Sequence, residues 1–176
     1  YEISGIIGRG GMGIVMKGCD VSLDRFVAIK VLNADYAGYS APRQRFAREA
    51  RAAAAVVHEN VISIFGVDQW NEMPYLVMPY VKGESLQQRI EKSAPLPMEE
   101  MLRISLQIAR GLAAAHDQGV VHRDIKPANI LMPASVSRVI ITDFGLARTV
   151  DDANLTRSGV LAGTPMYMSP EQVTGE

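Results

Sequence analysis

The chain has 176 residues, a formal net charge of −1 and 48% hydrophobic residues. This length can bury a hydrophobic core within one domain, and the small net charge argues against a global positive field that would attract nucleic acid or an acidic membrane. No apolar run reaches the length of a membrane span, and the first residues lack the charged and apolar segments of a secretion signal.

The first half of the chain predicts a small lobe built around a β-sheet. Its first 33 residues are rich in β-branched side chains interrupted by glycines, a pattern typical of short strands joined by turns. Two more apolar runs later in this half complete a five-stranded sheet. The expected strands cover residues 1–8, 13–20, 25–32, 61–68 and 75–78.

One helix is expected between the third and fourth strands. Pro42 suits its first turn, because proline lacks the N–H group that a first turn leaves unbonded. The helix should run to about Val57. The face expected to be buried carries Phe46, Ala50, Ala53 and Val57.

The second half of the chain begins with a helical pattern. A short helix is expected from Glu84 or Ser85 to about Lys92, and a long one from Pro97 to about Gln118. The long helix has two adjacent apolar faces, so we expect it to be buried from several sides. These faces carry Met101, Ile104, Ile108 and Leu112 on one side and Leu102, Leu106, Ala109 and Ala113 on the other.

The remaining chain predicts little regular structure. Short strands are expected at residues 130–132 and 138–142, and the run from 143 to 176 has the composition of a long loop.

A glycine-rich stretch near the start, Gly8-Arg9-Gly10-Gly11-Met12-Gly13, has the spacing G-x-G-x-x-G. In a dinucleotide-binding unit such glycines lead into a helix, whereas the strand-like residues 14–17 follow here. We therefore expect a hairpin turn whose backbone N–H groups can approach phosphate oxygens. An ordinary glycine-rich hairpin is the alternative.

Two later segments carry groups that suit phosphoryl transfer. They are His122-Arg123-Asp124-Ile125-Lys126-Pro127-Ala128-Asn129 and Asp143-Phe144-Gly145. Asp124 can accept the proton of an attacking hydroxyl group, while Asn129 and Asp143 can hold metal ions on phosphates. Upstream, Lys30 ends the apolar run 27–30 and needs an anionic partner if it faces inward; a solvated lysine is the alternative.

In this order, the motifs resemble those of the protein kinase family, and segments 9–13 and 163–171 resemble its bacterial serine/threonine group. The resemblance implies an α+β, protein-kinase-like fold of two lobes, with a complete β-rich N-lobe containing one helix and an incomplete helical C-lobe. The N-lobe would cover residues 1–78, the hinge 79–83, and the first part of the C-lobe 84–176. The domain would be truncated after Ser169-Pro170-Glu171.

The resemblance implies an ATP site between the lobes. Lys30 would grip the phosphates while paired with Glu49 on the helix. The glycines expected over the phosphates are Gly8, Gly10 and Gly13.

The resemblance also assigns the residues around adenine. Met78 would lie at the mouth of a back pocket, and adenine would bond to the carbonyl of Pro79 and the N–H of Val81. Proline keeps its carbonyl, so Pro79 should not abolish this contact. The apolar residues expected around the ring are Ile7, Val15, Ala28 and Leu131.

In the catalytic loop, Asp124 would position the substrate hydroxyl and Lys126 would neutralise charge on the transferred phosphoryl group. Thr164 would contact both residues, an arrangement typical of serine/threonine kinases. His122 would be structural, packed behind the magnesium-binding segment.

Regulation is expected in the activation loop. Arg123 can pair with a phosphate there, and Thr156 or Ser158 would carry it. The alternative is a polar loop with incidental hydroxyl groups such as Thr149. Glu171 would pair with an arginine from later helices.

The expected function is an ATP-dependent serine/threonine protein kinase that uses Mg²⁺ or Mn²⁺ and acts on proteins, not on nucleic acid. The alternatives are a truncated, catalytically weak nucleotide-binding or scaffold module and a small-molecule phosphotransferase of similar fold. The single cysteine, Cys19, fits a reducing compartment. We expect a cytoplasmic protein, or the cytoplasmic part of a membrane-anchored parent, with a kinase-domain dimer as one assembly.

Overall fold

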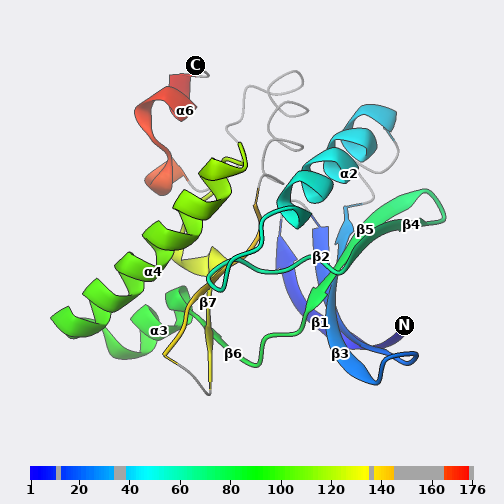
Figure 1. The fold of residues 1–176 in the computed structure, drawn as a ribbon. Coiled ribbons are helices and arrows are strands. Elements are labelled where there is room, and N and C mark those ends of the chain that lie inside the picture. Colours follow the sequence, from blue (N-terminus) through cyan, green and yellow to red (C-terminus); the bar gives the residue numbers. More distant parts are fainter. Residues whose placement is uncertain (11–12, 34–38, 135–136, 145–164, 175–176) are drawn as a thin grey trace.

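The computed structural model describes residues 1–10, 13–33, 39–134, 137–144 and 165–174. In Figure 1, a sheet with helix α2 forms one lobe, and helices α3 and α4 lie in the other. The sheet has the strand order β1-β2-β3-β5-β4, with every neighbouring pair antiparallel. Its strands are β1 (Glu2–Gly10), β2 (Gly13–Asp20), β3 (Arg25–Leu32), β4 (Gly66–Trp70) and β5 (Met73–Pro79).

This lobe confirms the predicted five strands and single helix. Helix α2 (Ser40–Ala54) buries Phe46, Ala50 and Ala53 as expected. Val57 does not belong to that face: it lies beyond the helix and is 92% exposed, while Val56 is buried instead. The helix ends three residues earlier than expected, so the periodic pattern no longer applies at Val57.

The fourth strand was also placed too early by the sequence. Its expected start, Val61, forms a bridge with Ile141, and the N–H of Ile62 donates to the carbonyl of Ile141 at 2.9 Å. These backbone groups are therefore bonded to the second lobe, and β4 begins only at Gly66.

The second lobe contains α3 (Leu86–Ser93), α4 (Met98–Asp117) and a three-stranded sheet of β6 (Gly83–Ser85), β7 (Ile130–Pro133) and β8 (Ile140–Ile141). Ser85 caps α3 in a reciprocal capping box with Gln88. Both helices agree with the predicted ranges. Within the described part of the chain, no helix is long and apolar enough to cross a bilayer.

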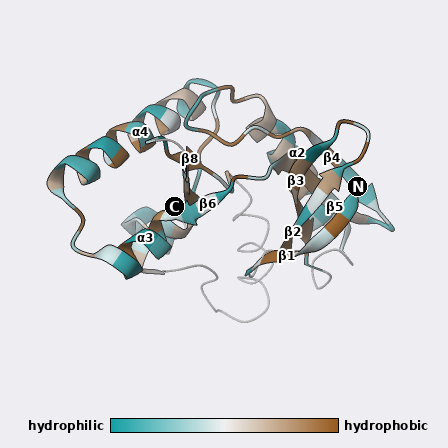
Figure 2. Cartoon of the chain, turned by 90° about the horizontal axis from the view of Figure 1, so that it is seen from below, coloured by the Kyte–Doolittle hydropathy of each residue, from teal (hydrophilic) through white to brown (hydrophobic). Residues whose placement is uncertain are grey.

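Helix α4 is covered on only one of its two apolar faces. Ile104 is buried in the core, whereas Leu102 and Leu106 are 63% and 52% exposed. Figure 2 shows brown and teal residues alternating along α4, while much of the brown gathers on the strands of the large sheet.

The run expected to be loop-like contains two short helices: the 3-10 helix η2 (Pro165–Tyr167) and α6 (Pro170–Thr174). The prediction was wrong at α6 because it overlooked a capping pattern. The N–H of Ser169 donates to Oε1 of Gln172 at 3.2 Å, which stabilises the start of the helix.

Candidate active site

The strand register brings the residues expected around adenine together. Val15 lies opposite Lys30, and Ala28 lies opposite Met78. Ala28 and Met78 belong to one buried apolar cluster, against which Val15, Val81 and Leu131 pack. Ile7 is 49% exposed and is not part of this cluster.

The glycine-rich stretch forms the hairpin between β1 and β2, with Gly10 opposite Gly13. A strand follows Gly13, so the dinucleotide-binding alternative is wrong. Gly13 has φ +153°, and a Cβ there would lie 1.9 Å from the carbonyl oxygen of Val31. Only glycine fits this position, whereas a Cβ at Gly8 would make ordinary contacts and one at Gly10 would meet open space.

Lys30 is buried on β3, and its Nζ lies 2.8 Å from Oδ1 of Asp143. The structure therefore gives Lys30 an ion-pair partner, Asp143, that the sequence did not suggest. The pairing of Lys30 with Glu49 stays a prediction. Burial acts to raise the pKa of Asp143, but the Lys30 ammonium outweighs it and keeps that pKa below its usual range.

The catalytic-loop residues are joined by side-chain contacts. Nζ of Lys126 lies 2.7 Å from Oδ2 of Asp124. The amide Nδ2 of Asn129 donates to the same carboxylate oxygen at 3.0 Å and to the backbone carbonyl of Asp124 at 2.8 Å. Asn129 is buried at the end of the 3-10 helix η1 (Pro127–Asn129). The loop thus fixes the orientation of the Asp124 carboxylate from two directions.

His122 has the structural position expected of it. Its buried ring lies 2.8 Å, through Nε2, from the carbonyl of Thr142, and its Nδ1 accepts from the N–H of Asp124 at 3.2 Å. This pattern requires the neutral ring with its proton on Nε2. Burial lowers the pKa of His122, in agreement with a neutral ring. The ring packs on Phe144 at a centroid separation of 4.6 Å.

The residues expected to hold a metal ion fit a hard cation such as Mg²⁺. Both amide hydrogens of Asn129 are directed at Asp124, which leaves its Oδ1 for a ligand. Asp143 offers a carboxylate, and the N–H of Thr142 donates to the carbonyl of Asn129 at 2.9 Å, so the two segments are neighbours. Among the described residues, no group of three His, Cys, Asp or Glu side chains suits a metal. Mg²⁺ characteristically combines one or two protein oxygens with substrate phosphates.

Helix α6 contacts the catalytic loop. The amide Nε2 of Gln172 donates to the carbonyl of Arg123 at 2.7 Å, and Arg123 has φ +65°. Sequence reasoning missed Gln172, although Ser169 and Gln172 have the spacing of a capping box.

Glu171 is exposed, and the hydroxyl of Ser169 lowers its pKa. The predicted positions Thr149, Thr156, Ser158 and Thr164 lie outside the described residues.

Asn60 is a second residue that the sequence did not single out. Its buried side chain donates to the carbonyl of Val139 at 2.9 Å and to Oε1 of Gln107 at 3.1 Å. Its backbone carbonyl accepts from Ile141 at 2.8 Å. Asn60 thereby fixes the segment between the lobes against α4 and β8. No local sequence pattern predicts these long-range contacts.

Comparisons with known proteins agree with this geometry. A family model described as "Protein kinase domain" matches residues 1–176. The chain is 41% identical over 175 residues to the serine/threonine-protein kinase PrkC of Bacillus subtilis and 37% identical over 181 residues to PknB of Mycobacterium leprae. These alignments cover 99% and 100% of the chain, but 27% and 29% of the relatives.

A solved structure has a similar fold. A double mutant of the PknI kinase domain of Mycobacterium tuberculosis matches with a TM-score of 0.76 and 30% identity, covering 84% of this chain and 59% of that one.

Proposed function

The chain belongs to the protein kinase domain family, and we propose on this basis that it transfers the γ-phosphoryl group of ATP to serine or threonine hydroxyl groups of proteins. The observation that carries the proposal is the joined set of Asp124, Lys126 and Asn129 beside the Lys30–Asp143 pair. Catalysis of this kind depends on positioning and on charge stabilisation.

Each polar residue has a role in this proposal. Asp124 accepts a hydrogen bond from the substrate hydroxyl and orients it, and Lys126 neutralises charge on the phosphoryl group. Lys30 holds the ATP phosphates, with Glu49 as a further partner. A divalent cation, Mg²⁺ or Mn²⁺, would neutralise the phosphates when bound. Its ligands would be Asn129 and Asp143.

The apolar cluster supports the adenine end of the same site. Val15, Ala28 and Leu131 would enclose the ring, and Ile7 would cover its exposed edge. The remaining proposed contacts are the backbone of Gly8, Gly10 and Gly13 to phosphate, Met78 at the back, and the carbonyl of Pro79 and N–H of Val81 to adenine.

We also propose that Thr156 or Ser158 is autophosphorylated and that Arg123 binds the phosphate. Thr164 would contact Asp124 and Lys126, and Glu171 would take part in an ion pair.

The division into N-lobe (1–78), hinge (79–83) and C-lobe (84–176) belongs to the same proposal. Cytoplasmic location, a dimer of kinase domains, and membrane attachment through another part of the parent protein stay predictions.

The weaker alternative is a nucleotide-binding or scaffold role without catalysis. It is disfavoured because Lys30, Asp124, Asn129 and Asp143 are all present, and contacts link them in two sets. A small-molecule phosphotransferase is disfavoured because the curated relatives are named as serine/threonine-protein kinases.

Calorimetry of ATP binding with and without Mg²⁺ tests the proposal. Asp143→Asn should remove most of the magnesium-dependent gain in affinity, because the variant loses the charge that would hold the cation. Asp117→Asn, at the exposed end of α4, removes the same charge elsewhere and should bind like the parent chain. Unchanged magnesium-dependent binding in Asp143→Asn would contradict the assignment.

A further inference from the structure

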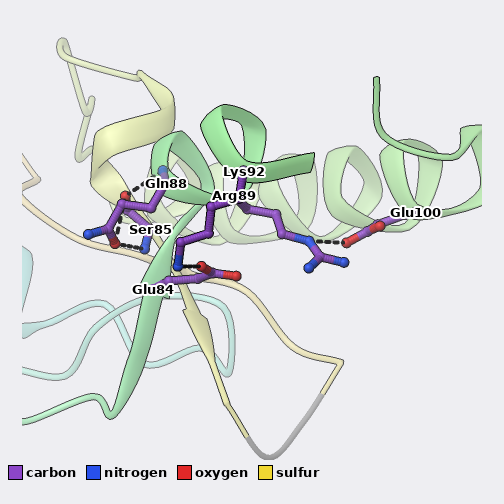
Figure 3. A network of polar contacts seen from close by, with 6 residues as sticks. All are labelled: Glu84, Ser85, Gln88, Arg89, Lys92 and Glu100. Carbon is purple, nitrogen blue, oxygen red and sulfur yellow. Dashed lines mark hydrogen bonds and ion pairs between the residues drawn. The ribbon is translucent and has the colours of Figure 1, made fainter. Parts of the chain in front are cut away.

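A groove on the second lobe lies away from the residues assigned to ATP. It has a volume of about 470 Å³ and lies between α3, α4 and the β6–β7 pair. This volume falls within the range of about 300–1,000 Å³ that is usual for ligand pockets. Figure 1 shows these elements together, and Figure 3 shows four of the charged residues that line the groove, Glu84, Arg89, Lys92 and Glu100.

Two ion pairs brace the walls of the groove. Nζ of Lys92 on α3 lies 2.7 Å from Glu84 on β6, and Nε of Arg89 on α3 lies 3.3 Å from Glu100 on α4 (Figure 3). Both pairs tie α3 to a different neighbouring element. At Gly83, which also lines the groove, a Cβ would lie 2.0 Å from the carbonyl oxygen of Met132. The wall beside β7 therefore needs glycine.

The positive and negative charges of the side chains that line the groove do not sum to zero. Both lining glutamates are already paired with Arg89 and Lys92, which leaves Arg103 and Arg138 as its uncompensated cations. Nη1 of Arg103 donates to the carbonyl of Ser137 at 2.9 Å, which holds its guanidinium beside the segment that carries Arg138. Arg138 is exposed and makes no hydrogen bond or ion pair with any other residue that the structure describes.

The floor between these cations is partly apolar. Met132, Pro133 and Val139 line it. Met132 packs on the core of the second lobe, whereas the preceding Leu131 packs on the cluster assigned to adenine. Met132, which lines the groove, thus lies on the opposite face of β7 from Leu131.

We propose that this groove docks a short acidic segment of a protein partner. Two aspartate or glutamate side chains would pair with Arg103 and Arg138, since guanidinium groups bind carboxylates in a two-pronged geometry. A neighbouring apolar side chain would lie on Met132 and Pro133. The apolar floor favours such a peptide over a small inorganic anion, and the chain's net charge of −1 disfavours a nucleic acid. That the partner is a kinase substrate rests on the proposed function, whereas the binding of an acidic peptide in the groove does not depend on that function.

Fluorescence anisotropy without ATP tests the docking site on the full chain. The probe is a labelled peptide with one leucine flanked by aspartates and glutamates, and its control is the same peptide with asparagines and glutamines. The acidic peptide should bind at least about tenfold more tightly than its control. Arg103→Gln with Arg138→Gln should remove most of this difference, and Arg138→Gln alone should remove part of it without changing the melting temperature.

The matched control is Arg51→Gln with Arg110→Gln, which removes two exposed charges outside the groove. It should bind the acidic peptide within about twofold of the parent chain. Equal losses in both double variants would show diffuse attraction and overturn the proposal, as would failure of the parent chain to prefer the acidic peptide. A single-stranded oligonucleotide that binds more tightly than the peptide, with the same dependence on Arg103 and Arg138, would also overturn it.

Phosphoryl transfer is measured separately. Loss of transfer with intact peptide binding would refute the proposed function alone, and intact transfer without peptide binding would refute the docking site alone.

Discussion

The large sheet and the catalytic loop hold their functional residues in different ways. In the sheet, backbone register places Val15, Ala28 and Met78 beside one another, and their side chains contribute only shape and apolar surface. In the loop, specific polar side chains fix the backbone: His122 accepts from the N–H of Asp124, and Asn129 donates to the carbonyl of Asp124. Substitutions of similar volume should therefore be tolerated in the sheet and not in the loop.

The largest effect is expected for Asp124→Ala. Turnover should fall by roughly 10²–10⁴, the usual range for a positioned acid–base group, while ATP affinity changes little. Steady-state phosphorylation of a protein substrate and ATP calorimetry measure the two quantities. Asp117→Ala is the matched control, and near-normal turnover in Asp124→Ala would remove Asp124 from the mechanism.

His122→Phe should lower the stability of the fold, although it replaces one ring with another. It keeps a ring against Phe144 but leaves the carbonyl of Thr142 and the N–H of Asp124 without their partner. Unsatisfied buried groups cost about 1–3 kcal/mol each, so the free energy of unfolding should fall by about 2–6 kcal/mol. Urea denaturation measures it. A loss below about 1 kcal/mol would show that these bonds do not hold the loop.

The same residue predicts a pH dependence. Because burial lowers the pKa of His122 below its ordinary value of 6.5, the folded state favours the neutral ring. This contribution is fully present above pH 6.5 and is lost as the pH falls below it, by up to about 1.4 kcal/mol per pH unit. The stability difference between the parent chain and His122→Phe should therefore shrink from pH 7.5 to pH 5.5. A constant difference would contradict the assignment of a neutral ring.

The smallest effect is expected in the sheet lobe. Leu76 is 2% exposed in the cluster that contains Ala28 and Met78. Leu76→Met nearly conserves volume and should cost less than about 1.5 kcal/mol in urea denaturation, with ATP affinity unchanged. If Leu76→Met lowered the free energy of unfolding as much as His122→Phe does, the sheet would be no more tolerant of substitution than the catalytic loop.

The same contrast explains what could be predicted from the sequence. Strands 13–20 and 25–32 were predicted correctly because their β-branched residues pack in a regular ladder. The segment after Val61 has a similar composition, but its first residues bond to Ile141 in the other lobe, and composition carries no information about such a partner.

The site residues differ in the same way: those with a local pattern could be predicted, and those that depend on distant segments could not. The spacing of Asp124 and Asn129 suggested their chemistry, and the structure brings them together. The sequence suggested Glu49 as the partner of Lys30. It did not suggest Asp143, because that contact depends on how the segment before Gly145 is placed against β3. The sequence did not single out Asn60, because the two partners of its side chain, Gln107 and Val139, lie 47 and 79 residues away.

The backbone on either side of the catalytic segment has a further consequence. Arg123 and Asp143 adopt φ values of +65° and +67°, a region that costs a residue with a Cβ about 1–3 kcal/mol. At Arg123, glycine would relieve that strain, yet it would remove the guanidinium that the proposed regulation uses. At Asp143, glycine would also leave the buried Lys30 ammonium without its carboxylate partner, so relief of the backbone strain would bring no net gain in stability there. The stability–activity trade-off is therefore confined to Arg123, where the residue that folds most stably and the residue that works are not the same.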